Sequence, residues 1–140
     1  MQGPSGLEVP FVAGFAPIVH DDESRQLYWG ALKLPLKEDA GYAHTGDLDG
    51  LKHFGLWPLS QAAESCFGKA EWPKDVPVPQ GCIEFEVEDV AQATKELEAK
   101  GYRLLVKNKT EPWGQVVTRF LAPEGLLIGL TFTPWMREKK

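Results

Sequence analysis

The sequence predicts an α+β fold in which one order of elements, strand–helix–strand–strand–strand, occurs twice. Three observations lead to this prediction. Two strand-like stretches, the apolar 11–19 and the alternating 82–87, each end shortly before an aspartate that opens a helical pattern. Each helical pattern is followed by three short β-compatible stretches, and a proline-rich segment separates the two sets. The repeat therefore divides one domain of 140 residues into two βαβββ modules.

The first predicted module spans residues 10–59. Its opening strand, 11–19, contains Pro17, which predicts an edge position or a bulge because proline cannot donate to a sheet. Asp21 is the predicted cap of a helix that ends near Lys33, before a Leu-Pro pair. Three further strands are predicted near residues 36–38, 42–47 and 52–59.

A proline-rich linker, residues 60–80 with a short helix near 61–67, precedes the second predicted module, 81–133. Apolar and polar residues alternate along 82–87, which is typical of a strand. Asp89 is the predicted cap of the following helix. Three more strands are predicted near residues 103–108, 115–121 and 126–132, and the tail from 134 onward is expected to lie at the surface.

The composition excludes several classes of protein. The formal net charge of −5 argues against a nucleic-acid partner, which normally requires a basic face. Apolar runs are too short to span a membrane, and the N-terminus lacks the basic region and apolar run of a signal peptide. Two cysteines without metal-binding or disulfide-framework spacing predict reduced thiols, so we expect a cytoplasmic protein.

Three stretches along the repeat carry a family resemblance. They are residues 16–34 (APIVHDDESRQLYWGALKL), 83–104 (IEFEVEDVAQATKELEAKGYRL) and 111–130 (EPWGQVVTRFLAPEGLLIGL). Their order resembles the vicinal-oxygen-chelate superfamily, which includes glyoxalase I, extradiol dioxygenases and bleomycin-resistance proteins. Lys33 and Ala122 depart from the family pattern, which has glycine and aspartate there. The resemblance implies that the two modules form a cupped mixed β-sheet and, by analogy, that the protein is a homodimer.

The resemblance also implies where a divalent metal would bind. Carried over to this sequence, the ligand positions fall at Gly14 or one of its two neighbours, at Cys82, at Gly129 and near His53. One histidine and one cysteine do not make the family's hard, octahedral site. We therefore expect no metal and no cofactor of the family type.

The three histidines, His20, His44 and His53, are not spaced as HxH or HxxxH pairs. The sequence predicts that they are surface or hydrogen-bonded residues. Whether they form a non-standard metal site is a question that the sequence leaves open.

The candidate ligand-binding residues come from strands and loops expected to line the cup. If Ile83, Phe85 and Val87 pack beneath the helix, the residues that alternate with them face the cup. The carboxylates of Glu84 and Glu86 would then favour a ligand that is a cation or a hydrogen-bond donor, unless they merely face water. Tryptophans add aromatic surface suited to planar or cationic ligands, although Trp113 can instead plug a structural corner. The candidates are Cys82, Glu84, Glu86, His53, Trp57 and Trp113.

These features favour a small-molecule binding protein that holds an aromatic or cationic compound without a metal, similar to the antibiotic-sequestering branch of the family. The alternative is a glyoxalase- or dioxygenase-like enzyme, a lyase or isomerase, with a non-standard metal site or an acid/base pair of Glu84 and His53. A third hypothesis is a regulatory module whose cup is filled by its own side chains.

Overall fold

The computed structural model describes residues 8–137; the terminal residues outside this range include the stretch on which the absence of a signal peptide was predicted. The first half contains β1 (Val12–Val19), α1 (Asp22–Arg25), the π-helix η1 (Gln26–Ala31), β2 (Lys37–Asp39), β3 (Tyr42–Thr45), β4 (Phe54–Pro58) and α2 (Leu59–Phe67). The second half contains β5 (Gly81–Glu86), α3 (Val90–Ala99), β6 (Leu104–Thr110), β7 (Val116–Leu121), β8 (Leu127–Phe132) and α4 (Pro134–Arg137).

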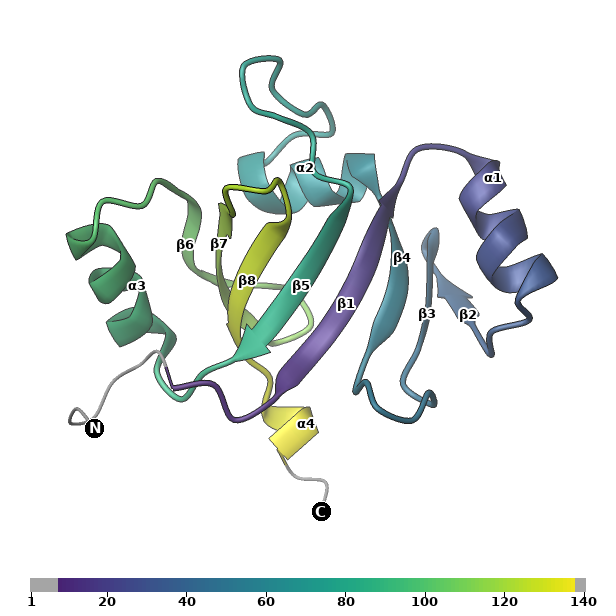
Figure 1. The fold of residues 1–140 in the computed structure, drawn as a ribbon, viewed down its shortest axis with the longest axis horizontal. Coiled ribbons are helices and arrows are strands. Elements are labelled where there is room, and N and C mark those ends of the chain that lie inside the picture. The colour runs from purple at the N-terminus through teal and green to yellow at the C-terminus, as the bar shows by residue number, and fades with distance from the viewer. Residues whose placement is uncertain (1–7, 138–140) are drawn as a thin grey trace.

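The strands of the described residues form one mixed sheet in the order β2-β3-β4-β1-β5-β8-β7-β6 (Figure 1). Within each half the first and last strands run parallel, β1 beside β4 and β5 beside β8. The two halves meet at the centre, where β1 and β5 pair antiparallel. The predicted α+β fold with a mixed sheet of two βαβββ modules is confirmed.

The capping aspartates begin the helices as the sequence predicts. The carboxylate of Asp21 accepts a hydrogen bond from the backbone N–H of Glu23 at 3.1 Å, and that of Asp89 accepts one from Gln92 at 3.0 Å. These bonds satisfy backbone donors that have no partner inside the first turn of a helix.

Pro17 lies in β1, at the centre of the sheet, so its predicted edge position is wrong. The register between β1 and β5 does shift, but between Val12 and Gly14 rather than at the proline. The pairing with β5 continues through the proline, which lies in register with Gly81. Directly after it, the N–H of Ile18 donates to the carbonyl of Gln80 at 2.9 Å.

Helices near the two ends of the sheet cover one of its faces (Figure 1). On the first module, the half-buried Tyr28 and Trp29 of η1 pack against Ala43 and Leu56. On the second, a stripe of α3 packs against Leu130. Side chains alternate along a strand, so the residues between these core positions point to the opposite, concave face.

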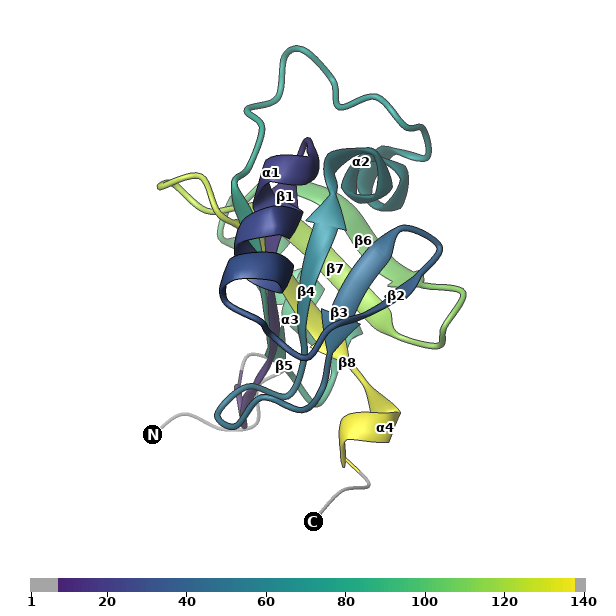
Figure 2. The same cartoon turned by 90° about the vertical axis from the view of Figure 1, so that its right-hand side faces the viewer.

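The concave face is closed at one end by α2, whose buried residues pack with Ile18, Cys82 and Leu127. At the other end lies α4, below the lower end of β8 (Figures 1 and 2). This helix was not predicted; residues 138–140 of the predicted surface tail lie outside the described range. No helix in the described part of the chain has both the length and the apolar character needed to cross a membrane.

Candidate functional site

The concave face holds a cavity of about 470 Å³, within the range of small-molecule sites. Both modules contribute to its wall, and most of the lining is apolar. Several aromatic side chains are part of it, among them Phe15, Trp57, Trp113 and Trp135. Trp113 and Trp135 are 56% and 42% exposed, which places them at the rim. An open cavity of this size does not fit the hypothesis of a cup filled by its own side chains.

The structure brings most of the predicted site residues together. Cys82, Glu84, His53, Trp57 and Trp113 all line this cavity. Whether they contact a ligand remains a prediction.

Glu86 lies outside the lining, which corrects its predicted place in the cup. It is fully buried at the end of β5, and its carboxylate accepts hydrogen bonds from the backbone N–H of Thr133 at 2.9 Å and from the Thr133 hydroxyl at 2.6 Å. This carboxylate therefore holds the chain where it enters α4.

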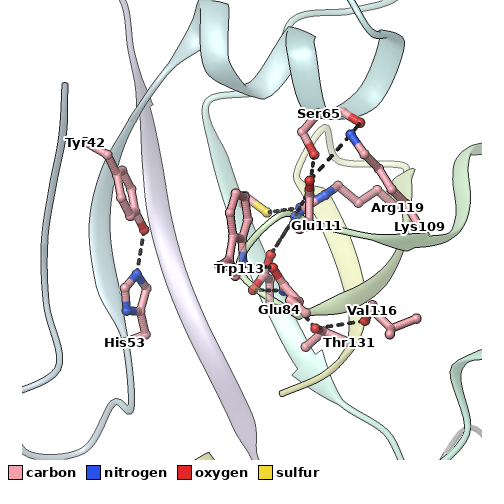
Figure 3. Close-up of polar contacts among 12 residues, drawn as sticks. Tyr42, His53, Ser65, Glu84, Lys109, Glu111, Trp113, Val116, Arg119 and Thr131 are labelled. Carbon is pink, nitrogen blue, oxygen red and sulfur yellow. Dashed lines mark hydrogen bonds and ion pairs between the residues drawn. The ribbon is translucent and has the colours of Figure 1, made fainter. Parts of the chain in front are cut away.

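The wall contributed by the second module is built around Arg119, which is 1% exposed. Its two terminal nitrogens both lie 3.1 Å from Oε2 of Glu84, and one of them lies 3.7 Å from Oε2 of Glu111 (Figure 3). Its guanidinium carbon also lies 4.8 Å from the centre of the Trp57 ring, a cation–π distance. Burial alone would lower the pKa of this guanidinium, but the adjacent carboxylates, chiefly Glu84, raise it above its ordinary value. Arg119 is therefore a permanent buried cation.

A glycine lets this ion pair form across three strands. Gly129 of β8 lies in register with Glu84 of β5 on one side and with Arg119 of β7 on the other. A Cβ added at Gly129 would lie 3.1 Å from Cγ of Glu84, tighter than normal contact. The two long side chains can meet above β8 because position 129 has no side chain.

Further hydrogen bonds extend this network in both directions (Figure 3). On one side, Oε2 of Glu111 accepts from Ser65 at 2.5 Å, and Oε1 lies 3.5 Å from the Lys109 ammonium. On the other, the Gln115 amide donates to Oε1 of Glu84 at 3.0 Å.

The network combines two carboxylates with two cations. The acidic lining expected from the sequence is corrected accordingly, because the charge of Glu84 is balanced by Arg119.

The opposing wall, from the first module, carries a pair of polar aromatic residues. The Tyr42 hydroxyl lies 2.6 Å from Nε2 of His53. His44 stacks beside both rings, 5.0 Å from Tyr42 and 5.4 Å from His53 between centroids, and its Nε2 lies 2.8 Å from a carboxylate oxygen of Asp39. A Cβ at Gly55 would collide with the Tyr42 ring, so this glycine makes room for the pair.

The environment of this pair determines its protonation. Burial, aided by the nearby His44, lowers the pKa of His53 from 6.5 to about 4. Burial, aided by the charge of Glu84, raises the pKa of Tyr42 above its ordinary value. At neutral pH the phenol therefore keeps its proton and the imidazole is neutral, and the tautomer of His53 sets which of the two donates in their hydrogen bond.

The residues at the implied metal positions do not fit the family's divalent ion. Gly14 and Gly129 have no ligating side chain, burial raises the pKa of the Cys82 thiol, and Nε2 of His53 is engaged by Tyr42. Among residues 8–137, no group of three or more histidine, cysteine, aspartate or glutamate side chains is placed to hold a metal. Of the three histidines, His44 and His53 lie together, whereas His20 is exposed and outside the cavity lining.

Sequence reasoning missed several polar residues of the lining, among them Tyr42, Gln115 and Arg119. The sequence does contain one signal for Arg119. It is a charged residue inside a largely apolar strand, and its neighbours on the same face, two positions away, are Val117 and Leu121. Nothing in the pattern around Tyr42 or Gln115 distinguishes them from ordinary strand residues.

Solved structures resemble this chain at low sequence identity. One, described as an NAD-dependent benzaldehyde dehydrogenase from Legionella pneumophila, matches with a TM-score of 0.57 and 16% identity, covering 85% of this chain and 96% of that one. A glyoxalase/bleomycin resistance protein/dioxygenase superfamily member from Vibrio splendidus 12B01 matches with a TM-score of 0.56 and 16% identity, covering 87% and 97%. A methylmalonyl-CoA epimerase from Streptomyces coelicolor matches with a TM-score of 0.50 and 14% identity, covering 90% and 99%. At such identities the likeness concerns the fold alone.

The sequence itself gives a more specific result. Comparison with curated proteins produced no match. The family model named Glyoxalase/Bleomycin resistance protein/Dioxygenase superfamily, however, matches residues 19–130, which include most of both modules. The chain therefore belongs to the glyoxalase/bleomycin resistance protein/dioxygenase superfamily.

Proposed function

We propose that this protein binds a small aromatic molecule in its cup without a metal. The observation that carries this proposal is the cavity of about 470 Å³, whose lining is mostly apolar and includes three tryptophans. Transfer of a flat apolar ligand from water into such a lining is favourable, and tryptophan faces favour stacking. Trp113 and Trp135 at the rim add exposed aromatic surface that a bound ligand would cover.

The aromatic character of the ligand has more support than a positive charge. Glu84 already faces Arg119 at 3.1 Å, so a cationic ligand would compete with an existing ion pair. Two unpaired cysteines agree with a reducing compartment, so we place this binding, and any sequestration of the compound, in the cytoplasm.

The test uses N-phenyl-1-naphthylamine, a neutral aromatic probe that fluoresces more strongly in apolar surroundings. We expect saturable binding of one probe per chain, and no change on adding EDTA. Trp113→Ala should weaken binding several-fold, whereas Tyr102→Ala, which removes an exposed aromatic residue that does not line the cavity, should not. A lack of saturable binding would overturn the proposal, as would binding that EDTA abolishes and a divalent ion restores.

A second candidate function, metal-free acid–base catalysis, is favoured by the Tyr42–His53 pair. With the imidazole proton on Nδ1, the Tyr42 oxygen can take a proton from a substrate while its own proton passes to Nε2 of His53, 2.6 Å away. The epimerase from Streptomyces coelicolor is named for methylmalonyl-CoA, which makes that thioester a suitable first substrate.

Incubation with methylmalonyl-CoA in D2O tests this candidate. Protein-dependent deuterium incorporation that is lost in Tyr42→Phe and His53→Gln, both still folded, would favour an enzyme. Incorporation that survives both substitutions would exclude this pair as the acid–base machinery.

A further inference from the structure

Around Glu84, the hydrogen-bond donors of the cavity wall are already engaged. Gln115 gives its amide hydrogens to Oε1 of Glu84 at 3.0 Å and to the Thr131 hydroxyl at 2.8 Å. The ring N–H of Trp113 donates to Oε1 of Gln115 at 2.8 Å. The Tyr42 hydroxyl and Nε2 of His53 are engaged with each other at 2.6 Å.

Arg119 offers a ligand no accessible donor either. Its terminal nitrogens face Glu84, Glu111 and the sulfur of Cys82. Its Nε is the one buried side-chain nitrogen or oxygen of the described residues without a hydrogen-bond partner, and it has almost no exposed surface. An anionic ligand would therefore have to break existing bonds to reach a positive group.

Acceptors, in contrast, retain capacity on both walls. A carboxylate oxygen can accept two hydrogen bonds, and Oε1 of Glu84 accepts one, from Gln115, within the part of the chain that the structure describes. The Glu84 side chain is 21% exposed and lines the cavity. On the other wall, the Tyr42 oxygen keeps at least one free lone pair, whichever group donates in its hydrogen bond with His53.

The two acceptors lie in the same cavity lining, on opposite sides of β1 (Figure 3). The charge of Glu84 contributes to raising the pKa of Tyr42, as expected for groups that share one poorly solvated space. A ligand held among the tryptophans would thus meet an acceptor on either side.

We infer, building on the proposed function, that the ligand is a neutral aromatic hydrogen-bond donor, of the phenol, indole or aromatic amine class, whose O–H or N–H binds Oε1 of Glu84. A charged acceptor in a poorly solvated site makes a stronger hydrogen bond than a neutral one. Tyr42 supplies the second, weaker acceptor.

Three matched probes test this inference by isothermal titration calorimetry on the full chain. 2-Naphthol carries a donor, 2-methoxynaphthalene has the same ring system without a donor, and 2-naphthoate carries an anionic acceptor. We expect 2-naphthol to bind roughly 10- to 100-fold more tightly than 2-methoxynaphthalene, the ratio expected for one hydrogen bond to a charged group. 2-Naphthoate should bind most weakly.

A substitution then locates the acceptor. Glu84→Gln should reduce the preference for 2-naphthol over 2-methoxynaphthalene to within about threefold while leaving the affinity for 2-methoxynaphthalene nearly unchanged. Glu98→Gln is the matched control, since Glu98 is exposed and pairs with Lys107 away from the cavity. Because Glu84→Gln leaves Arg119 with one fewer carboxylate, Tyr42→Phe serves as a second variant, with a smaller loss of preference expected.

Each outcome has a defined meaning. A large preference for 2-naphthol that Glu84→Gln removes supports the inference. Equal binding of 2-naphthol and 2-methoxynaphthalene, or tightest binding of 2-naphthoate, overturns it while leaving aromatic binding in the cup intact. If none of the three binds and N-phenyl-1-naphthylamine also fails, the proposed function falls together with the inference.

Discussion

Substitution of Arg119 should strongly destabilise the folded protein, because two carboxylates lie beside its guanidinium. Glu84 and Glu111 both lie near its guanidinium, and Glu111 is almost fully buried. Arg119→Met would keep a long apolar stem but leave Glu84 without its cation and Glu111 with Lys109 alone. We expect a loss of about 3–5 kcal/mol in the free energy of unfolding, measured by urea denaturation.

The double variant separates the ion pair from simple packing. With Glu84→Gln added, the loss should be smaller than the sum of the two single losses, because each substitution removes the other's partner. Additive losses would mean that the pair contributes little beyond the volume of its side chains.

His53 should make the stability of the protein depend on pH. Its pKa is about 4 in the folded protein against 6.5 ordinarily, so between these values the unfolded chain binds more protons. The contribution of the neutral His53 imidazole to the free energy of unfolding is therefore complete above pH 6.5 and is lost as the pH falls toward 4. By pH 5 the loss should be about 2 kcal/mol in the wild-type protein and absent in His53→Gln. NMR titration of the imidazole checks the cause directly, and a folded-state pKa near 6.5 would contradict the prediction.

At the scale of secondary-structure elements, the position of α4 depends on one buried side chain. The carboxylate of Glu86 holds Thr133 at the start of α4, and this helix brings Trp135 and Met136 into the cavity wall. Glu86→Gln replaces a charged acceptor with a neutral amide, so we expect a loss of about 1–3 kcal/mol in stability. Binding of N-phenyl-1-naphthylamine should weaken as well.

A comparison with Glu98→Gln shows whether the losses expected for Glu86→Gln are specific to that position. That exposed substitution should change the free energy of unfolding by no more than about 0.5 kcal/mol and leave binding unchanged. Unaltered probe binding in a folded Glu86→Gln protein would show that α4 does not shape the cup.

Elements with a local signal could be predicted from the sequence, and those that depend on distant partners could not. The alternation along β5 and the caps at Asp21 and Asp89 are determined by residues adjacent in the sequence, so the sequence predicts them. The pairing of Glu84 with Arg119 depends on the register of two strands on either side of Gly129, which no short stretch encodes. The same holds for Glu86, which the sequence predicts in the cup. Alternation indicates which face of the strand Glu86 lies on, but not that Thr133 binds its carboxylate in a buried position.

At the scale of the whole molecule, one chain carries both halves of the cup. The halves join where β1 and β5 pair, and residues of both modules line the same cavity. By analogy with the family we propose that two chains associate as a homodimer. The cavity wall of a single chain already contains the acceptors and tryptophans discussed above, so this association is not needed to complete it.

It follows that ligand affinity should not depend on association. Sedimentation velocity over a dilution series would find the concentration at which a dimer dissociates, and probe fluorescence would give Kd for N-phenyl-1-naphthylamine above and below it. We expect one probe per chain and the same Kd on both sides, because each cavity lies within one chain. Affinity that falls as the chains separate would mean that a partner subunit supplies part of the wall. A chain that stays monomeric throughout would overturn the homodimer and leave the single-chain cup as the binding unit.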